Sequence, residues 1–200
     1  MRPFMDILTD PNGYIIDYHD QDPELKPRAR QLCWQLGQVD PLDEAARRQI
    51  LTQLFGTFAD TANVYGGFQC DYGLNIHAQD GVFINYNVTM LDTSPINLGA
   101  GTMIGPGSVL ACPDHALDVA QRRFGICASK AITLEDDVWL GANVTVCGGV
   151  TIGAGSVVGA GSVVTRDIPA GVVAVGTPAK VVRAITAADK IPEALLTSRK

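Results

Sequence analysis

A six-residue period governs the second half of the chain. From position 134 every sixth residue is apolar, and the residue two places before it is aliphatic or serine. The first set is Leu134, Leu140, Val146, Ile152, Val158, Val164 and Ala170, and the second set is Ile132, Val138, Val144, Val150, Ser156, Ser162 and Ile168. A unit of this size is too short for a helix–turn–helix repeat but suits one short strand and a turn.

A repeat of this length predicts a parallel β-helix. Three units close one triangular coil, stacked coils form the solenoid, and each unit points an aliphatic side chain inward. A flat antiparallel sheet alternates at every second position and gives no six-residue recurrence. The frame is also present at Leu98, Ile104 and Leu110, and it is looser before Leu98. Because Leu134 falls on the same six-residue frame as Leu110, the insertion between them causes no loss of phase.

The N-terminal part of the chain, 1–60, follows a helical pattern instead. Asp22 is the expected N-cap of a helix that has Pro23 at its first position and ends at Gly37. A second helix is expected from Asp43 to Gly56. We therefore divide the chain into three parts. These are a helical segment at 1–60, a β-helix at 61–185 with an inserted loop at 112–131, and a tail or helix at 186–200.

Composition excludes several classes of function. The 200 residues include 15 basic and 21 acidic side chains, for a net charge of −6, so a nucleic-acid partner is not expected. No apolar run is long enough to predict a transmembrane helix, and Met1–Asp10 contains no apolar signal core. The five cysteines form no Cys-x-x-Cys pair, which is typical of reduced thiols in the cytoplasm. We expect a cytoplasmic protein with no membrane partner.

Several longer motifs resemble one enzyme family. They are FQCDYGLNI at 68–76, NYN at 85–87, LD at 91–92, DDVWLG at 136–141, GAGSVVTRDIP at 159–169 and GTPAKVVR at 176–183. With the repeat and the helical head, these motifs resemble the hexapeptide-repeat acyltransferases, and within them the maltose and galactoside O-acetyltransferases. The resemblance implies a mainly β, left-handed parallel β-helix and acetyl-CoA-dependent acetylation of a sugar hydroxyl. It also implies a homotrimer whose active sites lie between adjacent subunits.

His115 is the candidate general base. It stands where the repeat breaks into the inserted loop, and polar loops on a rigid scaffold commonly carry function. Histidine can accept a proton at neutral pH, and the family's base matches this position. His19 is expected at the surface, and His77 is expected to be structural. Cys112 also permits a Cys–His nucleophile, but free cysteines are usually small buried hydrophobes, and the family transfers the acyl group directly.

The resemblance assigns the acceptor and donor residues. Asn85 would sit beside His115 and hold the acceptor hydroxyl or the oxyanion, and Asp17, Asp71 and Asp92 would hydrogen-bond sugar hydroxyls. Thr93 stands where galactoside-type enzymes have a second acidic residue, which leaves glucose-type acceptors open. The expected acetyl-CoA contacts are a Trp139 wall, the amides of Ala142 and Ala160, and Thr165, Arg166, Lys180 and Arg183 near the phosphates.

Three other functions are compatible with parts of this pattern. The γ-type carbonic anhydrases share this fold but need three histidine ligands for zinc, and no third histidine follows His115, so no metal is expected. An acetyltransferase for a xenobiotic or another small alcohol is an alternative, although the helical head favours the sugar branch. A non-catalytic β-helix that only binds or assembles is a further alternative. The joint presence of Asn85, His115, Trp139 and Arg166 argues against it.

Overall fold

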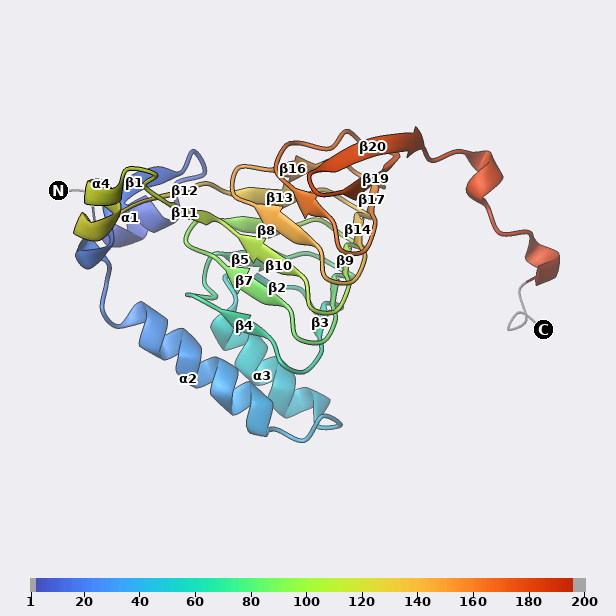
Figure 1. Ribbon diagram of the computed structural model, residues 1–200. Helices are drawn as coiled ribbons and strands as arrows, with labels where there is room; N and C mark the ends of the chain where they lie inside the picture. Colours follow the sequence, from blue (N-terminus) through green and yellow to red (C-terminus); the bar gives the residue numbers. More distant parts are fainter. Residues whose placement is uncertain (1–2, 196–200) are drawn as a thin grey trace.

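The computed structural model describes residues 3–195 and is built around a three-sided solenoid (Figure 1). Face 1 contains β2 (Thr57–Phe58), β5 (Ile76–Ala78), β8 (Ile96–Leu98), β13 (Ile132–Leu134) and β16 (Thr151–Ile152). Face 2 contains β3 (Asn63–Val64), β6 (Phe83–Ile84), β9 (Met103–Ile104), β14 (Trp139–Leu140), β17 (Val157–Val158), β19 (Val172–Gly176) and β20 (Ala179–Ala184). Face 3 contains β4 (Gln69–Cys70), β7 (Thr89–Leu91), β10 (Val109–Ala111), β15 (Thr145–Cys147) and β18 (Val163–Val164). Strands pair in parallel from coil to coil, which confirms the predicted β-helix.

The core of the solenoid is the stack of inward-facing aliphatic side chains that the period predicted. The residues of the main set from Leu134 to Val164 are at most 1% exposed. Ala170 departs from the prediction, because it is exposed at the surface. The last coil is shorter, so Ile168 bridges to Ile152 and Ala174 takes the next buried position.

The length of the coils changes along the solenoid. Ala78 and Leu98 are successive core positions on face 1, and so are Leu134 and Ile152, but the first pair is further apart in the sequence. The additional residues of each early coil fall where face 3 turns into face 1, at 71–75 and 91–95. These longer corners explain why the period is looser before Leu98.

The helical head comprises α1 (Phe4–Leu8), α2 (Leu25–Gln38) and α3 (Glu44–Leu54). Helices α2 and α3 cover the open end of the first coil, whereas α1 lies beside strand β1 (Tyr14–Asp17) (Figure 1). On α3, the guanidinium of Arg47 donates to the carbonyl oxygen of Val64 at 2.7 Å. Arg48 donates to those of Ala59 and Ala62 at 3.2 and 3.1 Å. These bonds satisfy carbonyl groups at an edge that has no preceding coil.

The helix ends differ in part from the sequence prediction. Asp43 caps α3 as expected, and its carboxylate accepts a hydrogen bond from the amide of Ala46. In α2, however, Glu24 is the N-cap, and Asp22 accepts the Glu24 amide in the turn before it. The helix also continues through Gly37 to Gln38, because the backbone becomes extended only at Val39.

The inserted segment is an ordered hairpin rather than a loop. It forms β11 (Pro113–His115), α4 (Val119–Phe124) and β12 (Ile126–Ser129). Strand β1 (Tyr14–Asp17), which the sequence analysis did not predict, pairs with β12 in an antiparallel sheet of order β1–β12–β11. This small sheet joins the N-terminal part of the chain to the insertion at one end of the molecule (Figure 1).

The chain leaves the solenoid through an antiparallel hairpin of β19 and β20. Two short 3-10 helices follow, η2 (Ala187–Asp189) and η3 (Glu193–Leu195), on a segment that projects away from the body (Figure 1). The rest of the predicted tail, 196–200, lies outside the described residues. Each helix within residues 3–195 is too short or too polar to cross a lipid bilayer.

Candidate active site

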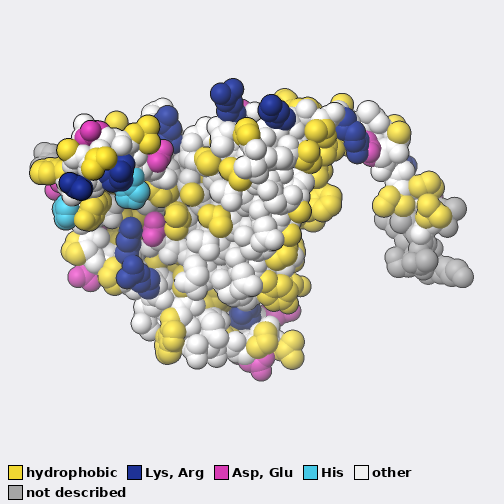
Figure 2. Space-filling model, viewed as in Figure 1, with side chains coloured by type: hydrophobic (Ala, Val, Ile, Leu, Met, Phe, Trp, Pro, Cys, Tyr) yellow, Lys and Arg dark blue, Asp and Glu magenta, His cyan; other side chains and the backbone are white. Residues whose placement is uncertain are grey.

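The small three-stranded sheet determines where His115 points. In its register His115 lies opposite Cys127, which lies opposite Ile16 on β1. Side chains alternate between the two faces of a strand, so His115 shares a face with Pro113 at the other end of β11. Ile15, the neighbour of Ile16, is 78% exposed on the opposite face. Figure 2 shows histidine side chains at this end of the molecule.

A cavity of about 360 Å³ lies under this sheet. The small sheet, the start of α2 and the corner between faces 3 and 1 enclose it. Its polar lining residues are Tyr14, Tyr18, Gln21, Lys26, Asp71, Thr93, His115 and Ser129. The volume lies within the usual range for small-molecule sites. Of the predicted acceptor residues, the structure brings His115 and Asp71 together here.

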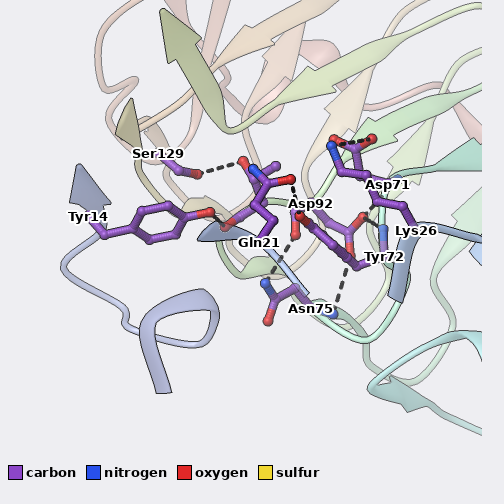
Figure 3. Close-up of polar contacts among 9 residues, drawn as sticks. Tyr14, Gln21, Lys26, Asp71, Tyr72, Asn75, Asp92 and Ser129 are labelled. Carbon is purple, nitrogen blue, oxygen red and sulfur yellow. Dashed lines mark hydrogen bonds and ion pairs between the residues drawn. The ribbon is translucent and has the colours of Figure 1, made fainter. Parts of the chain in front are cut away.

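Hydrogen bonds fix the walls of this cavity (Figure 3). The hydroxyl of Tyr14 donates to the carbonyl oxygen of Thr93 at 2.7 Å, and the Thr93 and Ser129 hydroxyls are 2.7 Å apart. Burial raises the pKa of Tyr14 to about 12, so its hydroxyl keeps its proton at neutral pH. Lys26 Nζ lies 3.6 Å from Asp71 Oδ1, which places an ion pair on the opposite wall.

Asp92 lies beneath the cavity rather than on its surface. It is completely buried, and one carboxylate oxygen accepts the amides of Asp71 and Tyr72 at 3.1 and 2.8 Å. The other oxygen accepts the amide of Asn75 at 3.3 Å. Burial raises the pKa of Asp92 to about 6, against the lowering effect of these hydrogen bonds. The structure therefore gives Asp92 the geometry of a residue that positions Asp71, instead of the direct sugar contact expected from the sequence.

Asp17 stands at the edge of the site. It ends β1, and its Oδ1 lies 2.7 Å from Nδ1 of His19. The backbone amide of His19 also donates to this carboxylate, and it is the main cause that lowers the pKa of Asp17. The neighbouring Tyr18 reaches the cavity, whereas Asp17 is not among its lining residues.

Several predicted donor-site residues share the corner between faces 2 and 3. The amide of Asn85 donates to the carbonyl oxygen of Ile104 one coil further on, and the amide of Gly141 donates to that of Val158 in the same way. Asn85 and Gly141 thus occupy equivalent positions in different coils, stacked along the solenoid axis. Ala142 and Ala160 lie next to these positions at the same corner. Trp139 is 48% exposed on the adjoining surface of face 2. The structure brings Asn85, Trp139, Ala142 and Ala160 to one edge of the solenoid.

Within one chain, Asn85 and His115 belong to different corners. Asn85 precedes strand β7 of face 3, whereas His115 belongs to the insertion that follows strand β10 of the same face. The short strands of face 3 lie between these corners, and Asn85 is not among the residues that line the His115 cavity. Thr165 and Arg166 follow strand β18, so they lie at the same corner as the insertion.

Of the basic residues predicted near the phosphates, Lys180 and Arg183 lie on β20. Both are exposed. Arg183 forms a two-pronged ion pair with Asp189 of the tail, with each nitrogen 2.8 Å from a carboxylate oxygen. This contact raises the pKa of Arg183 and lowers that of Asp189. An incoming phosphate would have to compete with Asp189 for the guanidinium.

Sequence reasoning missed several residues of the cavity. Tyr14, Tyr18, Gln21 and Lys26 come from the N-terminal part, and Cys127 lines the cavity opposite His115. One signal was present for β1, because the turn-forming pair Asn12-Gly13 precedes an apolar, β-branched stretch. No comparable motif marked Gln21 or Lys26, whose place depends on how α2 packs against the solenoid.

Known proteins match this chain over most of its length. Residues 131–166 match the family description "Bacterial transferase hexapeptide (six repeats)", and residues 17–59 match "Maltose acetyltransferase hexapeptide capping motif". The galactoside O-acetyltransferase of Escherichia coli (strain K12) is 35% identical over 168 residues, which are 84% of this chain and 83% of that protein. The chain belongs to the hexapeptide-repeat acetyltransferases. This membership confirms the predicted family and the prediction of an acetyl-CoA-dependent acetyltransferase.

Solved structures of hexapeptide-repeat acetyltransferases agree with the fold. A maltose O-acetyltransferase from Clostridium difficile 630 superposes with a TM-score of 0.86 at 33% identity, covering 93% of this chain and 98% of that one. An acetyltransferase from Vibrio cholerae O1 biovar eltor, solved with acetyl-CoA, gives a TM-score of 0.85 at 37% identity, covering 92% and 99%. Among residues 3–195 of this family member, no three His, Cys, Asp or Glu side chains are grouped to hold a metal ion.

Proposed function

We propose that this protein transfers the acetyl group of acetyl-CoA directly to a hydroxyl of a sugar, with His115 as the general base. The imidazole accepts the hydroxyl proton as the oxygen attacks the thioester carbonyl. Collapse of the tetrahedral intermediate expels the CoA thiolate, which takes the proton back from the imidazolium. Neither a metal nor a covalent acyl-enzyme is needed for this sequence of steps.

The observation that carries the proposal is the position of His115, which lines the cavity beneath the small sheet. The register of β11 and β12 directs this side chain toward the same space as Tyr14, Tyr18 and the Lys26–Asp71 pair. A carboxylate, an ammonium group and an amide supply acceptors and donors for several hydroxyls, and aromatic rings can cover an apolar sugar face. This combination supports a polyhydroxylated acceptor.

Cys112 gives little support to the alternative of a cysteine nucleophile. Its thiol is 2% exposed and donates to the carbonyl oxygen of Ser94 at 3.4 Å. Burial raises the pKa of Cys112 to about 12, so the reactive thiolate is scarce at neutral pH. A buried, protonated thiol favours direct transfer by His115 over a ping-pong route.

We propose further that the complete site forms between subunits of a homotrimer. In one chain, Asn85, Trp139, Ala142 and Ala160 lie at the edge between faces 2 and 3, and His115 lies at the next corner. A neighbouring solenoid that presents its Asn85 corner to the His115 cavity would bring base, oxyanion donor and thioester together. The exposed Trp139 beside Ala142 is consistent with a donor site that a second subunit covers.

A thiol-release assay with acetyl-CoA tests the function. The purified protein should release CoA with mono- or disaccharides and not with aromatic or short-chain alcohols. Activity with the non-sugar alcohols alone would replace the sugar acceptor by a xenobiotic-type acceptor. No release with any hydroxyl compound, despite acetyl-CoA binding measured by calorimetry, would favour a non-catalytic binding protein.

A further inference from the structure

Two cysteines that are distant in sequence meet between the helical head and the first coil. Cys33 lies on α2 and Cys70 on β4, and their sulfur atoms are 3.7 Å apart. Cys33 is 4% exposed, and Cys70 is half-buried. By contrast, the sulfurs of Cys112 and Cys127 donate to backbone carbonyl groups. The Cys33–Cys70 contact is therefore a dithiol with no role in the proposed acetyl transfer.

The two thiols are chemically unequal. A hydrogen bond from the Cys70 thiol stabilises the Cys33 thiolate and lowers the pKa of Cys33. The same contact, followed by burial and the nearby Asp92 carboxylate, raises the pKa of Cys70. The thiolate is the nucleophile toward oxidants, so the direction of these pKa shifts favours Cys33 as the attacking sulfur, and Cys33 is also the one of the two that lines a cavity.

A small oxidant can reach Cys33 through a separate cavity. This cavity measures about 260 Å³ and lies between the end of α2 and the first coil, where Cys33, Arg47, Gly66 and Gln69 are among its lining residues. Arg47 contributes a positive charge to the wall that also carries Cys33. Access to Cys33 therefore does not require passage through the cavity under the small sheet, called the acceptor cavity below because the proposed function places the acceptor there.

The dithiol is linked to one wall of the acceptor cavity on both sides. Cys70 immediately precedes Asp71, which lines that cavity. Cys33 lies two helical turns after Lys26 on α2, so the two side chains share one face of this helix. Because Lys26 and Asp71 form the ion pair at the cavity, the distance between α2 and β4 determines how that pair is held.

We infer that Cys33 and Cys70 form a reversible disulfide when the protein meets a peroxide, and that this bond alters the acceptor wall. The Cys33 thiolate attacks one peroxide oxygen, giving a sulfenic acid and releasing hydroxide, or an alkoxide from an alkyl hydroperoxide. The Cys70 thiol then attacks the oxidised sulfur; water leaves and the S–S bond forms. Two thiols lose two hydrogens in total, and a dithiol reductant restores them.

Bond formation requires movement beside the acceptor cavity. The sulfur atoms must close from 3.7 Å to the S–S bond length of about 2.0 Å. We expect side-chain rotation to absorb part of this shift and a small displacement of α2 or β4 to absorb the rest. A misplacement of about 1 Å in a catalytic site can cost about a hundredfold in rate. The effect on acceptor kinetics rests on the proposed function, whereas the disulfide itself does not.

Mass spectrometry of the full-length protein tests the disulfide. After treatment with one equivalent of hydrogen peroxide, the intact mass should fall by two hydrogens, and non-reducing digestion should yield a Cys33–Cys70 linked peptide. Cys33→Ala should abolish this peptide, and the matched control Cys147→Ala should leave it unchanged. A linked peptide between other cysteines, or only sulfinic acid at Cys33, would overturn the proposal.

Two further measurements test the link to the acceptor wall. Oxidation should lower the acceptor kcat/KM by about tenfold, an effect reversed by reductant and absent in Cys33→Ala, while the acetyl-CoA KM stays constant. Hydrogen exchange of the Tyr72 and Asn75 amides should change at the same time, and this readout needs no activity. Full cross-linking with unchanged exchange would refute the link. If oxidation changes the hydrogen exchange of these amides but the reduced protein acetylates no sugar, only the proposed acceptor is refuted.

Discussion

His115 and Cys127 are direct cross-strand partners in the antiparallel pair of β11 and β12. Their Cβ atoms are therefore neighbours, at the spacing of about 5 Å that such pairs adopt. Both residues line the cavity under the small sheet. The register between β11 and β12 therefore determines the direction in which the candidate base points.

Replacing His115 by alanine should abolish most catalysis without affecting the fold. The residue is exposed and lies outside the inward stack of the solenoid. We expect kcat to fall by about 10²–10⁴, the usual contribution of a general base, with acetyl-CoA affinity close to that of the wild type. Steady-state kinetics and calorimetric titration measure these two effects.

The matched control for this experiment is Cys112→Ala. Cys112 is close to His115 in the sequence but is buried and protonated, so direct transfer predicts that most activity remains. The direct-transfer mechanism would be wrong if Cys112→Ala were inactive while His115→Ala kept more than about a tenth of the rate.

Co-expression of two inactive variants should restore activity if sites are shared between subunits. Asn85→Ala and His115→Ala each remove one component of every site, but a mixed trimer contains one interface with both native residues. Random assembly predicts about a quarter of wild-type activity for a cyclic trimer. Activity that stays at the level of the separate variants, in samples shown by mass spectrometry to contain mixed trimers, would assign both residues to one chain.

Asp92→Asn should change how stability depends on pH. Burial raises the pKa of Asp92 to about 6 from an unfolded value of about 4. The folded state thus binds the proton more tightly than the unfolded state does. The resulting contribution to the free energy of unfolding is fully present below the pKa of the unfolded state, and it is lost as the pH rises through the pKa of the folded state. A shift of about two units corresponds to about 3 kcal/mol. The free energy of unfolding of Asp92→Asn, measured with urea, should not show this decrease with rising pH. The exposed control Asp60→Asn should show the same decrease as the wild type. Parallel curves for wild type and Asp92→Asn would contradict the assignment.

Substitution of Arg183 and substitution of its ion-pair partner Asp189 should have opposite effects on the acetyl-CoA KM. Arg183→Ala should raise the acetyl-CoA KM with little change in kcat, because phosphate contacts exist in ground and transition states alike. Asp189→Asn should lower that KM, because it frees the guanidinium from its two 2.8 Å contacts. Glu193→Gln, further along the tail, serves as the charge-matched control. If neither Arg183→Ala nor Asp189→Asn moves the KM, the Arg183–Asp189 pair only holds the tail.

The repeated part of the fold could be predicted because its rule is local. Each coil needs an aliphatic side chain at a fixed interval, so residues such as Leu140 and Val158 reveal their burial through spacing alone. The exceptions have physical causes. Ala170 is exposed because the final coil is shorter, and the longer corners of the early coils contain the buried Asp92 and the amides that bind it.

The candidate site was only partly predictable because it depends on contacts distant in sequence. His115 and Asp71 carry recognisable motifs, but Tyr14 reaches Thr93 across 79 positions and Cys33 reaches Cys70 across 37. Such contacts follow from how β1 and α2 dock on the solenoid, and no periodicity encodes that docking. The burial of Asp92 was not predictable for a related reason, since its motif position does not reveal that its carboxylate accepts backbone amides.

The insertion between β10 and β13 also has a consequence for how this protein could diversify. On face 1 the chain advances twice as far from Leu98 to Leu134 as it does from Leu134 to Ile152, so the detour returns to the stack in phase. Ser129 at the base of the hairpin is buried and bonded to Thr93, whereas α4 at its outer part has no buried residue, so the outer part is the one that the solenoid constrains least. If His115 and its cavity receive the acceptor as proposed, this hairpin could change during evolution without altering the stacked coils. Exchanging 112–131 between relatives should then transfer part of the acceptor preference and leave the edge with Trp139, Ala142 and Ala160 unchanged.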